Sequence, residues 1–143
     1  MAACTFFGHR ECFGVDTRIL RYTIKGLIDE GVDTFYVGNQ GQFDGVVYSC
    51  LKQFRKDYPN IRVCVVLAYL PTEQDEDGDM EDTMYPEIEG HPKFAIDRRN
   101  RWLIDNADYC VCYVNHPWGG AYKFARRMKG LGKLVINIGS AEL

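Results

Sequence analysis

Apolar residues follow two patterns along this chain: short unbroken runs, and longer stretches in which they recur three and four residues apart. The short runs predict five strands, at residues 3–7, 34–37, 61–67, 109–114 and 134–138. The longer spacings predict four helices, at residues 17–30, 43–58, 92–106 and 120–131. Strands that alternate with helices predict an α/β, Rossmann-like fold with a doubly wound, mostly parallel five-stranded sheet and helices on both faces.

The composition is that of one globular domain. The chain has 143 residues, 46% of them hydrophobic, and we expect a single domain over residues 1–143. The first seven residues lack the charged start and apolar run of a signal peptide, and no stretch approaches the roughly 20 apolar residues of a membrane span. We therefore expect a cytoplasmic protein outside the membrane. The six cysteines include no Cys-x-x-Cys pair and mostly lie in apolar runs, so they are expected to be reduced and buried.

The net charge of −3 conceals an asymmetric distribution. Residues 72–90 hold nine acidic residues and no lysine or arginine, whereas the rest of the chain has 17 basic residues against 11 acidic ones. We expect the acidic stretch to form a solvated loop, mobile until its partner binds. Its alternating aspartates do not fit an EF-hand, because Met80 stands where that loop needs glycine. The basic remainder suits an anionic ligand.

A cation and an amide interrupt the apolar face of the third predicted helix. At 3.6 residues per turn, Arg99 and Asn100 fall on the same face as Ile96, Leu103 and Ala107. A folded chain buries such groups only when something pairs with them, so this face indicates a site.

Polar or glycine residues follow four of the predicted strands. The four segments are Gly8-His9-Arg10, residues 38–44, residues 68–71 and residues 115–120. Ligands of doubly wound sheets bind beyond the carboxyl ends of the strands, and we therefore expect one shared pocket there. Asp44 begins a helix after the second of these turns. It is a candidate catalytic carboxylate, although an aspartate in that place is ordinarily a helix cap.

The side chains at these ends suit a phosphorylated ligand. Arg10, Arg99 and the backbone N–H groups of Gly119 to Ala121 suit phosphate, and polar amides suit ribose hydroxyls or a base edge. Tyr69 and Trp118 are candidates for stacking on a base, although Trp118 alternatively anchors its loop on the sheet. Three scattered histidines form no metal-binding pattern, so we expect no metal and no cofactor. The expected ligand-binding residues are Gly8, His9, Arg10, Gly38, Asn39, Gln40, Tyr69, Arg99, Asn100, Trp118, Gly119, Gly120 and Ala121.

The chain resembles a known superfamily over almost its whole length. Residues 94–104, Phe-Ala-Ile-Asp-Arg-Arg-Asn-Arg-Trp-Leu-Ile, precede an apolar strand, a glycine-rich turn and a basic helix. This arrangement resembles the Arg-Asn-Arg segment of the Smf/DprA DNA-processing proteins, which belong with the LOG phosphoribohydrolases in the SLOG superfamily. Residues 5–10 and 36–41 further resemble small stand-alone SLOG proteins of bacteria and their mobile elements. The resemblance implies a Rossmann-like sheet that binds nucleotides or nucleotide-derived molecules, in some members cleaving an N-glycosidic bond or sensing a cyclic ADP-ribose derivative.

One departure from the LOG pattern argues against an enzyme. LOG enzymes have a Gly-Gly-x-Gly-Thr turn followed by a glutamate that supports cleavage of the base–ribose bond. Here residues 117–124 read Pro-Trp-Gly-Gly-Ala-Tyr-Lys-Phe and contain no acid. A carboxylate is needed to stabilise an oxocarbenium-like transition state or to activate water, so a binding protein is favoured.

The sequence accordingly predicts a protein that binds a nucleotide or nucleotide-derived signal of the ADP-ribose or cyclic ADP-ribose type, as a sensor or sequestering agent. One alternative is an N-glycosidase or phosphoribohydrolase acting on a nucleoside monophosphate or an ADP-ribose-like substrate. A second is single-stranded DNA binding along a basic surface, formed by Arg98, Arg101, Arg126, Arg127, Lys129 and Lys133. No aromatic residues are interleaved with these cations, so a solvated face is favoured and no nucleic acid partner is expected.

Self-association is also expected. Tyr122, Phe124 and Met128 would suit a helix–helix interface in a homo-oligomer, unless they pack on the sheet instead.

Overall fold

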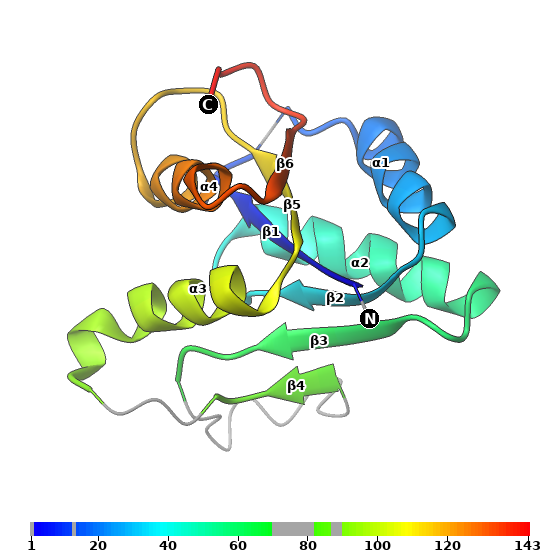
Figure 1. The fold of residues 1–143 in the computed structure, drawn as a ribbon, viewed down its shortest axis with the longest axis horizontal. Helices are drawn as coiled ribbons and strands as arrows, with labels where there is room; N and C mark the ends of the chain where they lie inside the picture. Colours follow the sequence, from blue (N-terminus) through cyan, green and yellow to red (C-terminus); the bar gives the residue numbers. More distant parts are fainter. Residues whose placement is uncertain (1, 13, 70–81, 87–89) are drawn as a thin grey trace.

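Strands and helices alternate at the positions that the apolar pattern predicts. The computed structural model describes residues 2–12, 14–69, 82–86 and 90–143. The strands are β1 (Ala2–Gly8), β2 (Val32–Val37), β3 (Arg62–Val66), β4 (Thr83–Met84), β5 (Tyr109–Tyr113) and β6 (Leu134–Asn137). The helices are α1 (Thr17–Asp29), α2 (Gln42–Asp57), α3 (Ala95–Asn106) and α4 (Gly120–Gly130), with a short 3-10 helix, η3 (Pro92–Phe94), before α3. Figure 1 shows the sheet in the middle, with α3 and α4 on one side and α1 and α2 on the other.

The sheet is parallel throughout and has the order β4-β3-β2-β1-β5-β6. From β1 the chain proceeds outward through β2 and β3, and it later returns to place β5 on the other side of β1. This reversal creates a topological switch point between β1 and β5, which is where sheets of this kind bind ligands. The expected α/β Rossmann-like class is confirmed.

The described sheet has six strands, not the expected five. The additional strand, β4, lies inside the acidic stretch and pairs Thr83 with Val65 and Met84 with Val66. Because β4 has only two residues and lies among acidic neighbours, it forms no apolar run. The periodicity of apolar residues therefore cannot predict it. Asp82, just before it, is not solvated as expected, because its carboxylate accepts hydrogen bonds from Tyr48 Oη at 2.8 Å and Arg55 Nη1 at 2.7 Å. The rest of the expected acidic loop, including most of residues 72–90, lies outside the described residues.

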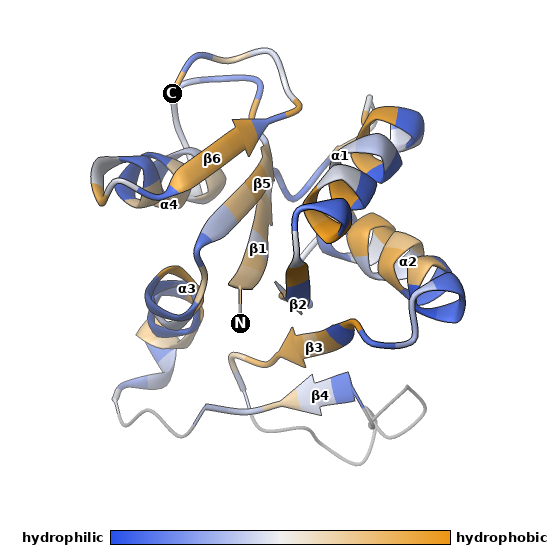
Figure 2. Cartoon of the chain, turned by 45° about the vertical axis from the view of Figure 1, so that its right-hand side comes forward, coloured by the Kyte–Doolittle hydropathy of each residue, from blue (hydrophilic) through white to orange (hydrophobic). Residues whose placement is uncertain are grey.

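The sheet carries a hydrophobic core on each face. Phe6 stacks on Phe35 at 6.3 Å between ring centroids, on the side covered by α1 and α2. The next residue, Phe7, stacks on Phe124 at 5.8 Å on the opposite side, under α3 and α4. Figure 2 shows hydrophobic strands between these two helical layers. Because both faces are covered, the inner strands read as continuous apolar runs rather than alternating ones.

The packing of these two cores tests several of the expectations about which side chains are buried. All six cysteines are buried and free, as their apolar positions predict. Phe124 and Met128 are also buried, so they pack on the sheet and offer no surface for self-association. In the described part of the chain, no helix combines the length and apolar character needed to cross a membrane.

The two helices that follow β2 and β5 begin at glycines. Gly41 and Gly119 have φ angles of 106° and 92°, in the region that favours glycine, and neither helix has a side-chain cap. In α2 the first N–H group, that of Gln42, donates to the carbonyl of Arg10 at 3.0 Å. At the start of α4 the structure shows no equivalent backbone acceptor among the described residues, so this helix end is open to a ligand.

Candidate functional site

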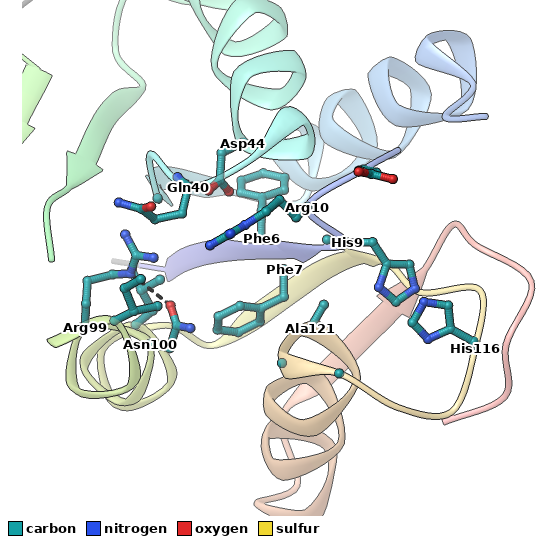
Figure 3. A pocket seen from close by; sticks show the side chains of 17 residues that line it. Phe6, Phe7, His9, Arg10, Gln40, Asp44, Arg99, Asn100, His116 and Ala121 are labelled. Carbon is teal, nitrogen blue, oxygen red and sulfur yellow. Dashed lines mark hydrogen bonds between the residues drawn. The ribbon is translucent and has the colours of Figure 1, made fainter. Parts of the chain in front are cut away.

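A cavity of about 500 Å³ lies at the switch point, beyond the carboxyl ends of β1, β2 and β5 (Figure 3). The segment after β1, the turn after β2, one face of α3 and the start of α4 form its wall. The residues expected to bind a ligand that do line it are Gly8, His9, Arg10, Gly38, Gln40, Arg99, Asn100, Gly119, Gly120 and Ala121. The structure therefore brings together, in one cavity, four segments that are far apart in the sequence.

Three of the residues expected at the site lie outside this wall. Asn39 accepts a hydrogen bond from Gln40 Nε2 at 3.2 Å, and the hydroxyl of Tyr69 donates to the carbonyl of Pro92 at 3.5 Å. Trp118 is 64% exposed, so it does not anchor its loop on the sheet.

Other wall residues were not among the expected ligand contacts. Ile96 and Leu103 share the helical face that drew attention to Arg99, and that face does line the cavity. Phe6 and Phe7 look like ordinary core residues in the sequence, and nothing local distinguishes them. The remaining additions are Glu11 and His116.

Arg99 is nearly fully buried, with 4% of its surface exposed. Its Nη1 donates to the carbonyl of Val66 at 2.9 Å, and its Nε donates to Oδ1 of Asn100 at 2.9 Å. Figure 3 shows the second of these bonds as a dashed line. Burial lowers the pKa of Arg99, and the nearby Asp44 carboxylate raises it. The guanidinium of Arg99 is thus hydrogen-bonded within the protein, and it joins α3 to the end of β3.

Asp44 lies in the same wall, across Gly38 from Arg99. A Cβ atom on Gly38 would stand 2.9 Å from both Arg99 Nη1 and Asp44 Oδ2, so a larger residue would have to displace one of these two side chains. Asp44 Oδ2 accepts the backbone N–H of Gln40 at 2.8 Å, so it braces the turn before α2 and does not cap the helix, whose N-cap is Gly41. Burial raises the pKa of Asp44 to about 6, against the lowering effects of the Gln40 N–H and Arg99.

Arg10 differs from Arg99 because its side chain is exposed and free. It makes no side-chain hydrogen bond or ion pair with the described residues. Figure 3 shows its guanidinium projecting into the cavity, whose wall also includes the uncapped start of α4 at Gly119 to Ala121. An unpaired guanidinium and the open N–H groups of a helix end both favour an anion. The cavity therefore presents two anion-binding features to the same space.

Three aromatic rings form a stack at one end of the cavity. The centroids of His9 and His116 are 3.8 Å apart, those of His116 and Trp118 are 4.1 Å apart, and both pairs are tilted by 17°. His9 Nε2 accepts the backbone N–H of Asn115 at 2.9 Å, which places the proton of the neutral ring on Nδ1. Burial and the neighbouring His116 lower the pKa of His9. The inner end of the stack is therefore a neutral ring held by the backbone.

Comparison of the sequence with protein-family models and with curated proteins yields no match. Comparison of the structure with solved structures does yield matches. DNA processing protein A (DprA) from Streptococcus pneumoniae has a TM-score of 0.70 and 16% identity over 99% of this chain. The chain has a DprA-like fold. DprA from Helicobacter pylori, whose structure is described as showing a unique single-stranded DNA binding mode, has a TM-score of 0.64 and 12% identity over 95% of this chain.

At these identities the matches show a likeness in fold alone. This chain spans 52% of the Streptococcus protein and 64% of the Helicobacter protein. The small stand-alone branch suggested by residues 5–10 and 36–41 stays a prediction.

The likeness to DprA corrects one expectation. We expected no nucleic acid partner, but the Helicobacter neighbour binds single-stranded DNA. Some cations of the basic surface on α3, α4 and the turn after α4 bond within the protein. Lys129 Nζ, for example, donates to the Leu143 carbonyl at 2.6 Å, and Lys133 Nζ donates to the carbonyl of Ile104.

Proposed function

We propose that the cavity at the switch point binds the phosphodiester backbone of single-stranded DNA. The observation that carries this proposal is the free guanidinium of Arg10 in the same wall as the uncapped start of α4. The DprA-like fold supports it, since one protein with that fold is described as binding single-stranded DNA.

The chemistry of the wall suits a phosphate diester. Arg10 has two N–H donors in the geometry that matches two phosphate oxygens, and it loses no internal bond when it uses them. The N–H groups of Gly120 and Ala121 are available to a third oxygen, favoured by the positive end of the helix dipole. Arg99 adds a buried positive charge behind this surface, partly balanced by Asp44.

The concave arrangement of these donors favours a single strand. Arg10 and the start of α4 come from separate segments and line the same cavity, so a phosphate must enter that cavity to meet both. A flexible single strand can bend one phosphate into such a space, whereas a stiff duplex presents its backbone along a straight, wide surface.

A nucleotide-derived small molecule of the ADP-ribose type is a second candidate for the same cavity. The observation in its favour is the cavity volume of about 500 Å³, which lies within the range typical of small-ligand pockets. The amides of Gln40 and Asn100 in the wall suit ribose hydroxyls. The N-glycosidase alternative would use the same cavity with Asp44 as its acid or base, since a pKa of about 6 suits proton transfer near neutral pH.

The test is fluorescence anisotropy with a labelled 15-nucleotide oligo-dT, for the wild type and Arg10→Ala. Loss of one charge-assisted phosphate contact should weaken binding roughly 10- to 100-fold at a fixed salt concentration. It should also reduce the slope of log K against log salt by about 0.7, because one phosphate fewer is neutralised. Arg127→Ala is the matched control, since Arg127 is exposed in the last turn of α4, away from the cavity.

The outcomes separate the proposals. No binding by the wild type, or equal losses in Arg10→Ala and Arg127→Ala, contradicts a DNA site in the cavity. Displacement of the oligonucleotide by micromolar ADP-ribose, recovered intact by chromatography, favours the small-molecule candidate. Release of a free base during the incubation, abolished in Asp44→Asn, favours the N-glycosidase.

A further inference from the structure

We infer that the exposed face of Trp118 is a stacking site for one unpaired nucleobase, next to the phosphate cavity. This inference rests on the proposed function and adds to it the part of the nucleotide that the cavity itself does not hold.

The indole of Trp118 is the outer member of the three-ring stack. One of its faces is covered by His116, at 4.1 Å between centroids and a tilt of 17°, yet 64% of the residue remains exposed. Among the described residues, no ring other than His116 contacts Trp118, and the high exposure of the residue leaves the other face of the indole toward solvent. The stack ends in a flat, solvent-facing aromatic surface.

The stack is held in place before any ligand arrives. His9 receives the N–H of Asn115 at 2.9 Å, and Nδ1 of His116 lies 3.0 Å from the carbonyl oxygen of Trp118. Because these three rings are already fixed, stacking a base on Trp118 costs little further side-chain entropy. This is the advantage of a preorganised site. A lone exposed tryptophan on a loose turn would lack this support.

The stack adjoins the phosphate site directly. His9 and His116 belong to the cavity wall, and Figure 3 shows them together at one end of it. Trp118 immediately precedes Gly119, the N-cap of α4. A strand whose phosphate meets the start of α4 therefore has its neighbouring base within reach of the indole.

A stacking surface of this kind distinguishes unpaired bases from paired ones, but it does not distinguish one type of base from another. Every base has a π face, so stacking on an aromatic side chain tolerates any sequence. A base inside a duplex has both faces covered by its neighbours and cannot use the site without being unstacked. The chemical class recognised is thus an unpaired base in a single strand or at an end.

The test compares two probes and three variants. The probes are a 15-nucleotide oligo-dT and an abasic oligonucleotide of the same length, which keeps the phosphates and sugars. We expect Trp118→Ala to weaken oligo-dT binding about tenfold and to leave abasic binding unchanged. Trp118→Phe, which keeps a ring, should stay within about threefold of the wild type on the same scale. Tyr22→Ala is the control, because Tyr22 is an aromatic residue on α1 that is 82% exposed.

A second measurement does not depend on removing Trp118. The chain has two tryptophans, so Trp102→Phe leaves Trp118 as the only indole. The replacement ring can still pack edge-on against Tyr36, as Trp102 does at 5.2 Å. Oligo-dT should quench the fluorescence of this variant, and the abasic probe should not.

The results distinguish failure of this inference from failure of the proposed function. Unchanged oligo-dT binding in Trp118→Ala, equal loss for both probes, or absence of quenching overturns the stacking site. If Arg10→Ala still weakens both probes, the phosphate site stands without it. If the wild type binds neither probe, both proposals are wrong.

Discussion

Asp44→Asn tests the electrostatics of the cavity most directly. The wild-type carboxylate is held in the wall by one backbone hydrogen bond from Gln40, and burial raises its pKa to about 6. Asparagine has nearly the same shape and its oxygen can accept the same N–H, but it carries no charge. The substitution therefore removes the net cost of ionising a buried group, in which the attraction to Arg99 offsets part of the desolvation.

The size of the effect follows from proton linkage. The pKa of this carboxyl is about 6 in the folded chain, against its ordinary value of 3.8 when exposed. Between these two values the folded protein holds a proton that the unfolded chain has released, so wild-type stability falls as the pH rises. At 1.36 kcal/mol for each tenfold change in proton affinity, the loss amounts to about 3 kcal/mol above pH 6. Asparagine does not titrate and suffers no such loss.

The assay is urea denaturation of the wild type and Asp44→Asn at intervals from pH 4 to pH 7.5. The quantity of interest is the difference between their free energies of unfolding. It should favour the variant progressively as the pH rises, by up to about 3 kcal/mol, and level off above pH 6. Any cost of fitting the asparagine amide into the wall is the same at every pH. It therefore shifts the difference in unfolding free energy by a constant and does not change how that difference depends on pH.

A difference that stays constant across this range would contradict the buried, raised pKa of Asp44, and so would one that favours the wild type more at high pH. Asp57→Asn is the matched control, because Asp57 ends the same helix but is exposed. A change of equal size in that variant would assign the effect to the net charge of the protein rather than to burial. DNA binding gives a second readout, since Asp44→Asn should strengthen it at pH 7.5 and leave it unchanged at pH 4.5.

Two further predictions concern the buried Arg99 and Gly139, a glycine that follows β6. Arg99→Met should lower the free energy of unfolding by about 1–3 kcal/mol at pH 8 and by less at pH 5, because it unpairs the Val66 carbonyl and removes a positive charge that faces Asp44. Urea titrations at both pH values measure this, and equal losses at both would contradict it. Gly139→Ala should destabilise by about 1–3 kcal/mol, because its Cβ would lie 2.5 Å from the carbonyl oxygen of Val114. Thermal denaturation of this variant measures the loss, and Gly26→Ala, in an open position within α1, is the control that should stabilise by about 0.5–1 kcal/mol; similar losses in both variants would contradict the steric explanation.

Much of the fold was predictable because its signals are local. The predicted helix at residues 17–30 corresponds to α1 (Thr17–Asp29), and the strand at 109–114 to β5 (Tyr109–Tyr113). Apolar periodicity reports how each segment is buried, and burial on both faces produces the unbroken runs seen in β3 and β5. The two-residue strand β4 was not predicted, because its formation depends on pairing with β3 rather than on any pattern of its own.

The candidate site was predictable only in part. Arg99 was recognisable in the sequence because a cation on an apolar helical face is a local contradiction. Its partner, the carbonyl of Val66, was not, because that contact spans 33 residues and depends on how α3 crosses the end of β3. Likewise, a motif search cannot tell a free arginine such as Arg10 from a paired one.

Local patterns in the sequence are enough to predict the helices, every strand except β4, the fold class and most of the residues at the rim, since each depends on neighbours within a few positions. Three-dimensional packing determines which rim residues share a cavity and which of them are free. The stack of His9, His116 and Trp118 shows the reason most clearly. It exists because β1 pairs with β5, with Gly8 opposite Tyr113, and this brings together two turns more than 100 residues apart. Strand pairing is a choice among distant segments, and no local period along the chain records it.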